Sequence, residues 1–492
     1  MTEAEPPRVV IVGGGIAGLA AAFFLRDEPV AVTVLEGSAR IGGKLAVSEV
    51  AGAPVDEGAE SLLARRPEGT DLIRAVGLGG QLAEPGTTSA GVWTRGRLRP
   101  LPARQFLGVP ADLAELERSG VLSAAGLARA RQDEGLPATP RGDDVPVGGY
   151  IGARFGQELV DRLVDPLLGG VYAGRSEELS FEATMPALAQ ESRRHASLAA
   201  AASALVGPPG RSQPPRPAGP VFTTLAGGLG TLPDAVAAAA GARVRTGVMV
   251  RELARAPSGW RLTAGSAHAP EQITADAVIL AVPARPASRL LAGIAGDASG
   301  ALAGIPYASI AIVTLAYREQ AFPRPPAGSG YLVPAVDGHP VKAVTFATGK
   351  WPQLAAAAPG TVLVRCSLGR AGEEATLQRD DTELAALAAA DLAAATGVTG
   401  APAAARVSRW GGALPQYLTG HLGRVARVRA GVAAQPGLAV CGAAYDGLGI
   451  PACVATARTA AAQVAAYLAG PHGQAGHGTG PMRDPGAARS RG

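Results

Sequence analysis

The stretch from residue 8 to residue 36 limits the folds open to this chain more than any other part of its sequence. It begins with the apolar run Arg8–Val12, continues through a glycine-rich turn at 13–18, and then shows a helical apolar pattern over 16–26. A second valine-rich run follows at 30–35. A strand, a turn, a helix and a second strand at this spacing predict a parallel sheet in an α/β fold.

The glycines of the turn form the pattern G-x-G-x-x-G at Gly13, Gly15 and Gly18, and Glu36 follows the second predicted strand. In nucleotide-binding folds the first glycine permits the tight turn, the second lets a pyrophosphate approach the backbone, and the third lets helix and strand pack closely. The helix N-terminus attracts phosphate, and an acidic residue at the position of Glu36 accepts hydrogen bonds from a ribose. Together these features predict a dinucleotide site.

A membrane span is the alternative interpretation of this region, because residues 9–25 carry no charge. A run of that length is at the lower limit for a span. However, four glycines interrupt it, and the residues before it include Glu3 and Glu5 rather than the basic start of a signal peptide. We therefore expect no transmembrane segment, while peripheral contact with a membrane stays open.

Charge and cysteine content exclude other classes. The 45 basic and 41 acidic residues are mixed along the chain without a polybasic run, so a nucleic-acid partner is not expected. Only three of the basic residues are lysines, at 44, 342 and 350. The three cysteines, at 366, 441 and 453, are far apart and show no CxxC spacing. No disulfide framework and no metal site is therefore expected, and a reducing, cytoplasmic location fits.

The pattern along the chain divides it into six segments. Features of the dinucleotide-binding domain occupy 1–85, 221–295 and 405–470, interrupted by a helical cap over the substrate at 86–220 and a second substrate-covering region of α+β character at 296–404. Residues 207–220 are predicted to form a linker, and 471–492 a disordered tail. The individual predictions are helices at 110–118, 122–132, 231–240, 382–395 and 451–468, and strands at 244–250, 277–282, 310–317, 361–367 and 438–441.

Several longer motifs carry a resemblance to a known family. They are VDEGAES at 55–61, YIGARFG at 150–156, LVDPLLGGVYAG at 163–174, LAGGLGTLP at 225–233, WGGALPQY at 410–417 and GAAYDGLGIP at 442–451. With the RIGGK loop at 40–44, they resemble the FAD-dependent porphyrinogen oxidases of the amine oxidase superfamily, over roughly residues 8–468. The resemblance implies a glutathione-reductase-like FAD domain and the oxidation of coproporphyrinogen III or protoporphyrinogen IX in heme synthesis.

The resemblance also implies a set of positions that contact non-covalently bound FAD. They are Gly13, Gly14, Gly15, Ile16, Ala17, Gly18, Glu36, Gly37, Arg40, Gly43, Lys44, Gly58, Ala59, Glu60, Ser61, Val250, Trp410, Gly442, Leu448, Gly449 and Ile450. Arg40 or Lys44 would offset pyrophosphate charge, Trp410 would lie near the flavin, and the helix after the last glycines would favour negative charge on the reduced flavin.

The implied chemistry removes six electrons from a porphyrinogen in three two-electron steps, with dioxygen reduced to hydrogen peroxide. Glu60 is the candidate catalytic residue, as an acceptor for pyrrole N–H groups and as a proton acceptor if burial raises its pKa; capping the helix near Pro67 or pairing with Arg65 is the structural alternative. Arg65 and Arg66 are the candidate substrate-binding residues, with Arg97 and Arg99 as the alternative pair, because arginine forks suit carboxylates. In some relatives an arginine stands where this chain has Ala90.

The substrate is left open between coproporphyrinogen III, which we favour, and protoporphyrinogen IX. An amine or carotenoid oxidoreductase shares the FAD motifs but does not account for the motif at 163–174. A flavin-fold binding protein without turnover is the alternative from another class, and it predicts no yellow colour and no peroxide. A transient contact with a ferrochelatase, which would receive the porphyrin, is also expected.

Overall fold

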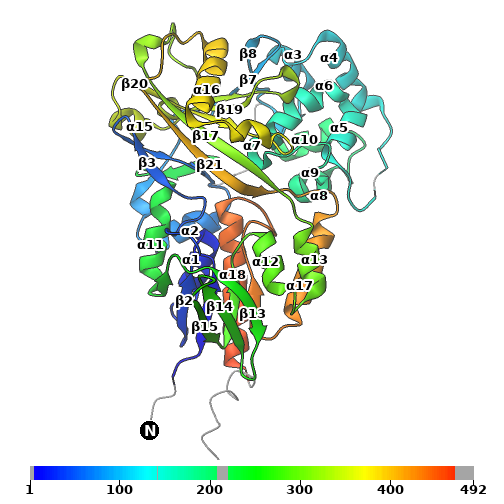
Figure 1. The fold of residues 1–492 in the computed structure, drawn as a ribbon. Helices are drawn as coiled ribbons and strands as arrows, with labels where there is room; N and C mark the ends of the chain where they lie inside the picture. Colours follow the sequence, from blue (N-terminus) through cyan, green and yellow to red (C-terminus); the bar gives the residue numbers. More distant parts are fainter. Residues whose placement is uncertain (1–4, 141, 208–219, 471–492) are drawn as a thin grey trace, which may run out of the picture.

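A computed structural model of the protein describes residues 5–140, 142–207 and 220–470. In Figure 1 a parallel sheet with its helices forms the lower half, and a larger sheet and a group of helices form the upper half. The predicted linker at 207–220, apart from its two end residues, and the predicted tail at 471–492 lie outside the described residues.

The lower half is built on a five-stranded parallel sheet with the order β12-β2-β1-β16-β22. Its strands are β1 (Arg8–Val12), β2 (Ala31–Leu35), β12 (Arg243–Arg245), β16 (Ala277–Leu280) and β22 (Leu438–Val440). One face packs on α1 (Ile16–Phe24), α2 (Pro67–Ala75), α11 (Leu232–Ala240) and α18 (Ile450–Ala469). The other packs on the antiparallel sheet β13 (Val250–Arg255), β14 (Trp260–Gly265) and β15 (Pro270–Ala275), and on α12 (Ala284–Leu291), α13 (Gly296–Ala303) and α17 (His421–Ala433).

Both faces of the parallel sheet are buried, which explains its continuous apolar strands. In β1, Val9 and Ile11 belong to the core under α1 and α18, whereas Val10 and Val12 belong to the core under α12 and the antiparallel sheet. The alternation follows from the two-residue period of a strand. A charge-free stretch at 9–25 therefore indicates a doubly covered strand and a buried helix, and none of the described helices is long and apolar enough to cross a membrane.

The upper half holds a seven-stranded sheet with the order β21-β17-β20-β19-β18-β7-β8. Its strands are β7 (Gly91–Thr94), β8 (Arg97–Pro100), β17 (Tyr307–Arg318), β18 (Gly330–Leu332), β19 (Val341–Phe346), β20 (Thr361–Leu368) and β21 (Ala404–Pro415). Helix α16 (Asp381–Thr396) packs on this sheet, and α14 (Ala347–Lys350) and α15 (Pro352–Ala357) follow β19. The capping box formed by Asp380 and Glu383 starts α16.

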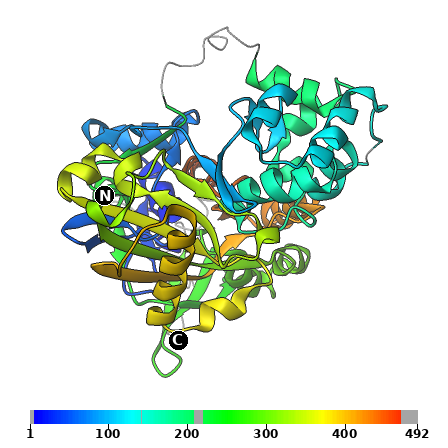
Figure 2. The same cartoon turned by 90° about the horizontal axis from the view of Figure 1, so that it is seen from above.

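A separate core unites the helices between residues 113 and 206. They are α3 (Leu113–Ser119), α4 (Ala124–Ala130), α5 (Val147–Phe155), α6 (Gln157–Leu159), α7 (Asp165–Tyr172), α8 (Phe181–Thr184), α9 (Pro186–Glu191) and α10 (Leu198–Val206). Figure 2 shows them grouped on one side of the molecule, next to the larger sheet. The remaining strands form small pairs and a triplet: β3 (Val47–Val50) with β4 (Ala53–Asp56), β9 (Gln105–Phe106) with β10 (Val109–Pro110), and β5 (Leu62–Leu63) and β6 (Leu82–Ala83) with β11 (Phe222–Leu225).

Most predicted elements are present, with three corrections. The strand predicted at 244–250 is wrong: Gly247 has φ +70°, and the chain turns there from β12 into β13 of a different sheet. The helix predicted at 110–118 begins at Leu113, because the Asp112 side chain caps it by accepting hydrogen bonds from Ala114 and Glu115. The predicted segment limits at 86 and 405 also need correction. Strands β7 and β8 lie in the predicted helical cap at 86–220, and β21 lies almost wholly in the predicted FAD-binding segment at 405–470, yet all three belong to the seven-stranded sheet.

Candidate functional site

The three glycines of the G-x-G-x-x-G pattern, Gly13 and Gly15 before α1 and Gly18 inside it, are glycines for two different reasons. A Cβ on Gly13, whose φ is +110°, would lie 2.6 Å from the carbonyl oxygen of Ala281, and a Cβ on Gly18 would lie 1.9 Å from the carbonyl oxygen of Gly13. The backbone of the protein itself therefore requires these two. Gly15 has φ −72°, and apart from its chain neighbours no described atom lies within 4 Å of the position its Cβ would take. The open space at Gly15 fits a ligand that approaches the backbone at the N-terminus of α1.

Glu36 lies against this turn at the end of β2. Its carboxylate accepts hydrogen bonds from the backbone N–H of Gly14 at 2.7 Å and of Ser38 at 2.8 Å. Its carbonyl oxygen accepts from Val248 N–H at 2.8 Å, just before β13 begins with Val250. The structure thus brings Glu36 and Val250 to the same edge of the parallel sheet, as the predicted adenosine end of the site requires.

The loop at 40–44 lies directly beside the glycine turn, because the N–H of Gly42 donates to the carbonyl oxygen of Gly14 at 2.8 Å. The Arg40 guanidinium donates to carbonyl oxygens of its own loop, 2.7 Å from that of Gly43 and 3.1 Å from that of Leu45. Arg40 therefore braces the loop. Lys44 is half-buried, and desolvation by burial lowers the pKa of its ammonium group. Arg40 and Lys44 are the two predicted phosphate partners. Arg40 uses its guanidinium to hold the loop, so Lys44 is the better candidate for binding phosphate.

The stretch at 57–61 packs against this loop. A Cβ on Gly58 would lie 2.0 Å from the carbonyl oxygen of Lys44 and 3.3 Å from Cζ2 of Trp410, so only glycine fits. The indole Nε1–H of Trp410 donates to the carbonyl oxygen of Glu57 at 2.8 Å. Ala59, next in the stretch, is exposed. Trp410 in β21 and the 57–61 stretch are therefore packed together and joined by a hydrogen bond; we call this surface the 57–61 wall.

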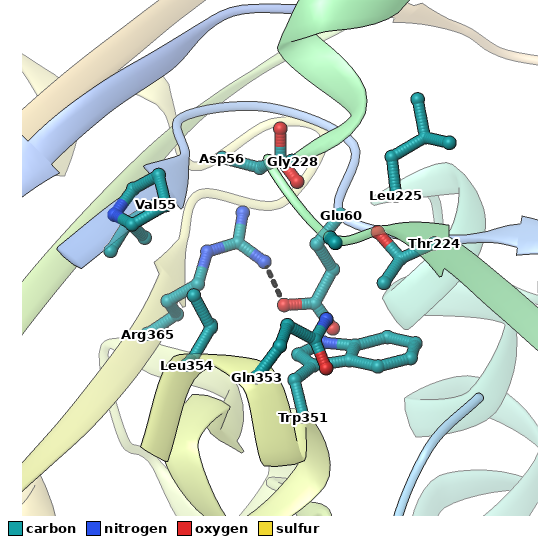
Figure 3. A pocket seen from close by; sticks show the side chains of 12 residues that line it. Val55, Asp56, Glu60, Thr224, Leu225, Gly228, Trp351, Gln353, Leu354 and Arg365 are labelled. Carbon is teal, nitrogen blue, oxygen red and sulfur yellow. Dashed lines mark hydrogen bonds and ion pairs between the residues drawn. The ribbon is translucent and has the colours of Figure 1, made fainter. Parts of the chain in front are cut away.

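Glu60 does not have the environment of a proton acceptor. Its carboxylate accepts a hydrogen bond from Nζ of Lys350 at 2.6 Å and another from Nη1 of Arg365. The bond to Arg365 is the dashed line in Figure 3. The side chains of Glu60, Lys350 and Arg365 are 14%, 15% and 7% exposed. Burial alone would raise the pKa of Glu60, but the charges and hydrogen bonds of Lys350 and Arg365 lower it to about 2. The condition for the proton-acceptor role, a pKa raised by burial, is therefore not met, and the partners of Glu60 are Lys350 and Arg365 rather than the helix near Pro67 or Arg65. Arg365 also donates to the carbonyl oxygen of Gly58 at 2.6 Å.

Asp56 is the neighbouring buried carboxylate, and it holds a different segment. It accepts hydrogen bonds from the backbone N–H of Leu229 at 3.0 Å and of Gly230 at 2.8 Å. Burial raises the pKa of Asp56 to about 6, although these hydrogen bonds and Arg365 act in the opposite direction. Asp56, Glu60 and Arg365 line the cavity of Figure 3, whose volume is about 20 Å³. Such a cavity accommodates one water molecule and no organic substrate.

The loop at 442–449 completes the site from the C-terminal side. Gly442 and Gly447 have φ +118° and +140°, and the Cβ position of Gly442 is 3.8 Å from Cβ of Ala17 in α1. Gly449 is the N-cap of α18 and provides no side-chain cap, so no side chain in the described part of the chain caps the first N–H groups of this helix. Ile450 is buried in the core under the parallel sheet, and Leu448 packs on the core of the helical region.

These segments match a known family. The family described as flavin containing amine oxidoreductase matches residues 16–465. The chain belongs to this family. It is 37% identical over 465 residues to a coproporphyrinogen III oxidase of Mycobacterium tuberculosis (strain ATCC 25618 / H37Rv), covering 93% of this chain and 97% of the relative. A coproporphyrinogen III oxidase of Bacillus subtilis (strain 168) is 31% identical over 468 residues, covering 94% and 98%.

A solved structure shows the same architecture. The crystal structure from Exiguobacterium sp. 255-15, named as a protoporphyrinogen oxidase, superposes with a TM-score of 0.81 at 31% identity, covering 94% of this chain and 99% of that one. The predicted family, the glutathione-reductase-like fold and the oxidoreductase class are therefore confirmed, and the cofactor of this flavin oxidoreductase family is a flavin.

The two predicted substrate-binding residues, Arg65 and Arg66, lie just before α2. Arg66 precedes α2, is 41% exposed and pairs with Glu68 at 2.7 Å, and Arg65 beside it is exposed. A Cβ on Gly69 of α2 would lie 3.2 Å from Cγ of Pro451, so the first turns of α2 and α18 are in contact. The two arginines thus precede a helix that contacts the first turn of α18, and their contact with a substrate stays a prediction.

A larger hollow of about 590 Å³ lies beside Trp410, between β17, β21 and the start of α16. Its arginines are already paired, Arg409 with Asp381 and Arg379 with Glu383 at 3.9 Å. The hollow therefore offers little uncompensated positive charge to a substrate with several carboxylates.

Sequence reasoning missed the partners that hold the site together. Lys350 and Arg365 reach Glu60 from 290 and 305 residues away. Two of the three lysines of the chain, Lys44 and Lys350, lie at this site, and their rarity beside 42 arginines was the available signal. Cys453 was also missed: it lies in the first turn of α18 with its thiol 3.8 Å from the carbonyl oxygen of Leu448, and burial raises its pKa to about 11.

Proposed function

We propose that the protein oxidises coproporphyrinogen III to coproporphyrin III with FAD bound non-covalently. The observation that carries the proposal is the open space at Gly15, which the protein leaves at a helix N-terminus between Glu36 and the loop at 42–43. The 37% and 31% identity to relatives named coproporphyrinogen III oxidase, over nearly the whole chain, supports the substrate.

The residues present fit FAD. The N–H groups at the start of α1, which has no side-chain cap, and the ammonium of Lys44 suit the pyrophosphate, and the carboxylate of Glu36 suits the ribose. The backbone of 58–61, the indole of Trp410 and the N-terminus of α18 suit the isoalloxazine and its negative charge when reduced. The thiol of Cys453, kept protonated by its raised pKa, supports non-covalent binding, because the thiolate is the reactive form.

When bound, FAD supplies the two-electron oxidation, and the side chains described here position the reactants. Glu60, held by Lys350 and Arg365, fixes the 57–61 wall and stays ionised at neutral pH, so it is a positioning residue in this proposal. Conversion of a porphyrinogen to a porphyrin removes six electrons and six hydrogens. Three dioxygen molecules are therefore reduced to three hydrogen peroxide molecules for each product.

Arg65 and Arg66 are proposed to bind substrate carboxylates, because coproporphyrinogen III presents four propionates and protoporphyrinogen IX two. Protoporphyrinogen IX is the second candidate, because the name of the Exiguobacterium protein contains protoporphyrinogen. The three free, buried cysteines fit a reducing compartment, and we propose a cytoplasmic location with transient transfer of product to a ferrochelatase.

The test uses both porphyrinogens, prepared without oxygen. Enzyme and air are added, and porphyrin fluorescence and peroxide are followed; we expect faster turnover of coproporphyrinogen III. Greater turnover of protoporphyrinogen IX would reassign the substrate, and no turnover of either would contradict the proposal. Filtration of the denatured protein should release FAD into the filtrate, and flavin retained with the polypeptide would show covalent attachment.

A further inference from the structure

The loop at 442–449 is held mainly by side chains from other parts of the chain. The N–H of Gly442 donates to Oγ1 of Thr456 at 3.0 Å, and the N–H of Gly447 donates to the hydroxyl of Tyr417 at 2.8 Å. The same hydroxyl donates to the carbonyl oxygen of Ala443 at 2.7 Å. One phenol oxygen therefore joins the two halves of the loop and satisfies one donor and one acceptor of its backbone.

Tyr417 is itself firmly fixed. Its ring is 1% exposed and stacks on the imidazole of His421, with centroids 3.8 Å apart and planes 13° apart. Burial raises the pKa of the Tyr417 phenol far above neutrality, so the hydroxyl keeps its proton and can donate. Burial also lowers the pKa of His421 to about 4, so the stacked imidazole is neutral near pH 7, and its Nε2 lies 3.3 Å from the carbonyl oxygen of Tyr445 in the same loop.

Tyr417 also connects the loop to the motif at 163–174, which nothing in the proposed chemistry uses. Its ring centroid lies 5.6 Å from that of Tyr172 at the end of α7. The adjacent Gln416 donates from Nε2 to the carbonyl oxygen of Tyr172 at 2.7 Å, and a Cβ on Gly174 would lie 2.2 Å from Oε1 of Gln416. The motifs at 163–174, 410–417 and 442–451 are therefore parts of one packed unit.

We infer that Tyr417 is a positioning residue for the flavin: its hydroxyl sets the shape of the 442–449 loop and so the place of the α18 N-terminus against the isoalloxazine. This inference rests on the proposed function, because that proposal places the flavin at this loop. Without the hydroxyl, the N–H of Gly447 and the carbonyl oxygen of Ala443, both partly buried, lose their hydrogen-bond partner. The loop would then relax, and α18 would no longer present its N–H groups in the same position.

The test is Tyr417→Phe in the FAD-loaded enzyme, with Tyr331→Phe as the matched control. Tyr331 is also a buried tyrosine, 3% exposed, and in the described part of the chain its hydroxyl has no hydrogen-bond partner. For Tyr417→Phe we expect the FAD dissociation constant to rise by roughly 10- to 100-fold. The midpoint potential of the bound flavin should fall, because the reduced, anionic flavin loses stabilisation. Tyr331→Phe should match the wild type in both measurements.

Wild-type FAD affinity and potential in Tyr417→Phe, even with a lower melting temperature, would overturn the inference, because the hydroxyl would then be structural only. His421→Phe keeps a stacked ring and leaves the Tyr417 hydroxyl with both of its hydrogen bonds, so it is a second control. If Tyr417→Phe folds only with FAD present, both variants are prepared with FAD, and equal retention of FAD by the two would overturn the inference. A wild-type protein that binds no FAD would overturn the proposed function together with this inference. Normal wild-type binding with an unaffected Tyr417→Phe would overturn the inference alone.

Discussion

Replacing Glu60 by glutamine distinguishes two roles for this residue: a structural ion pair with Lys350 and Arg365, or a proton acceptor in the reaction. The pKa of Glu60 is lowered from 4.5 to about 2 in the folded protein. At about 1.4 kcal/mol per pKa unit, the ionised carboxylate adds about 3 kcal/mol to folding stability at neutral pH. A similar loss, about 3–5 kcal/mol, is typical when one partner of a buried ion pair is removed. Glu60→Gln keeps the size of the side chain and leaves Lys350 and Arg365 buried without their counter-charge.

The pH dependence follows from the sign of this shift. Because the folded pKa lies below the unfolded value, the stabilisation is complete above about pH 4.5 and is lost as the pH falls from about 4.5 to 2. Glu60→Gln should therefore be about 3 kcal/mol less stable than the wild type at pH 7, and the difference should shrink below about pH 4.5.

The assay is urea unfolding followed by tryptophan fluorescence, to which Trp351, 4.9 Å from the Lys350 ammonium, contributes. Lys350→Met and the double variant complete a cycle, and the double variant should lose about 1–3 kcal/mol less than the sum of the single losses. Glu57→Gln is the matched control: its partner Arg406 is 48% exposed, so the loss should stay below about 1 kcal/mol. If the stability losses of Glu60→Gln and Lys350→Met simply add in the double variant, the ion pair does not stabilise the fold as argued. If Glu60→Gln keeps its stability but reduces the flavin much more slowly, Glu60 acts in acid–base chemistry instead.

Three further predictions concern the cofactor, the substrate and a buried histidine. Gly15→Val should fold, because its Cβ meets open space, but should purify without visible flavin absorbance, whereas Gly300→Val, also facing open space, should stay yellow. Neutralising Arg65 and Arg66 together should raise KM for coproporphyrinogen III more than it lowers kcat, and an unchanged KM would exclude them from binding. The lowered pKa of His421 predicts stability that is complete above about pH 6.5 and lost as the pH falls toward 4; His421→Phe should flatten this dependence, and an equally steep acid profile would show that other groups cause it.

Features encoded over short stretches were predictable from sequence. The turn at 13–18, its flanking strand and helix, and Glu36 all lie within 30 residues, and the structure places them together as predicted. The helix at Asp381–Thr396 was predicted near its limits, because a capping box starts it and Gly397, with φ +74°, ends it. The strand predicted across Gly247 failed, because the valines on either side belong to different sheets and local pattern does not report which partner a strand pairs with.

The sequence by itself determined the fold class, the dinucleotide turn and the motifs through which the family is identified, because each depends on residues that are neighbours along the chain. Only the tertiary structure decided the state of Glu60. Its carboxyl is strongly acidic because the folding of the seven-stranded sheet brings Lys350 and Arg365 to it across about 300 residues. The same is true of Tyr417, whose hydroxyl meets Ala443 and Gly447 only after β21 and α18 have packed. Burial and charge pairing are properties of the assembled core, so no local pattern could have set the pKa of Glu60 or revealed the tie at Tyr417.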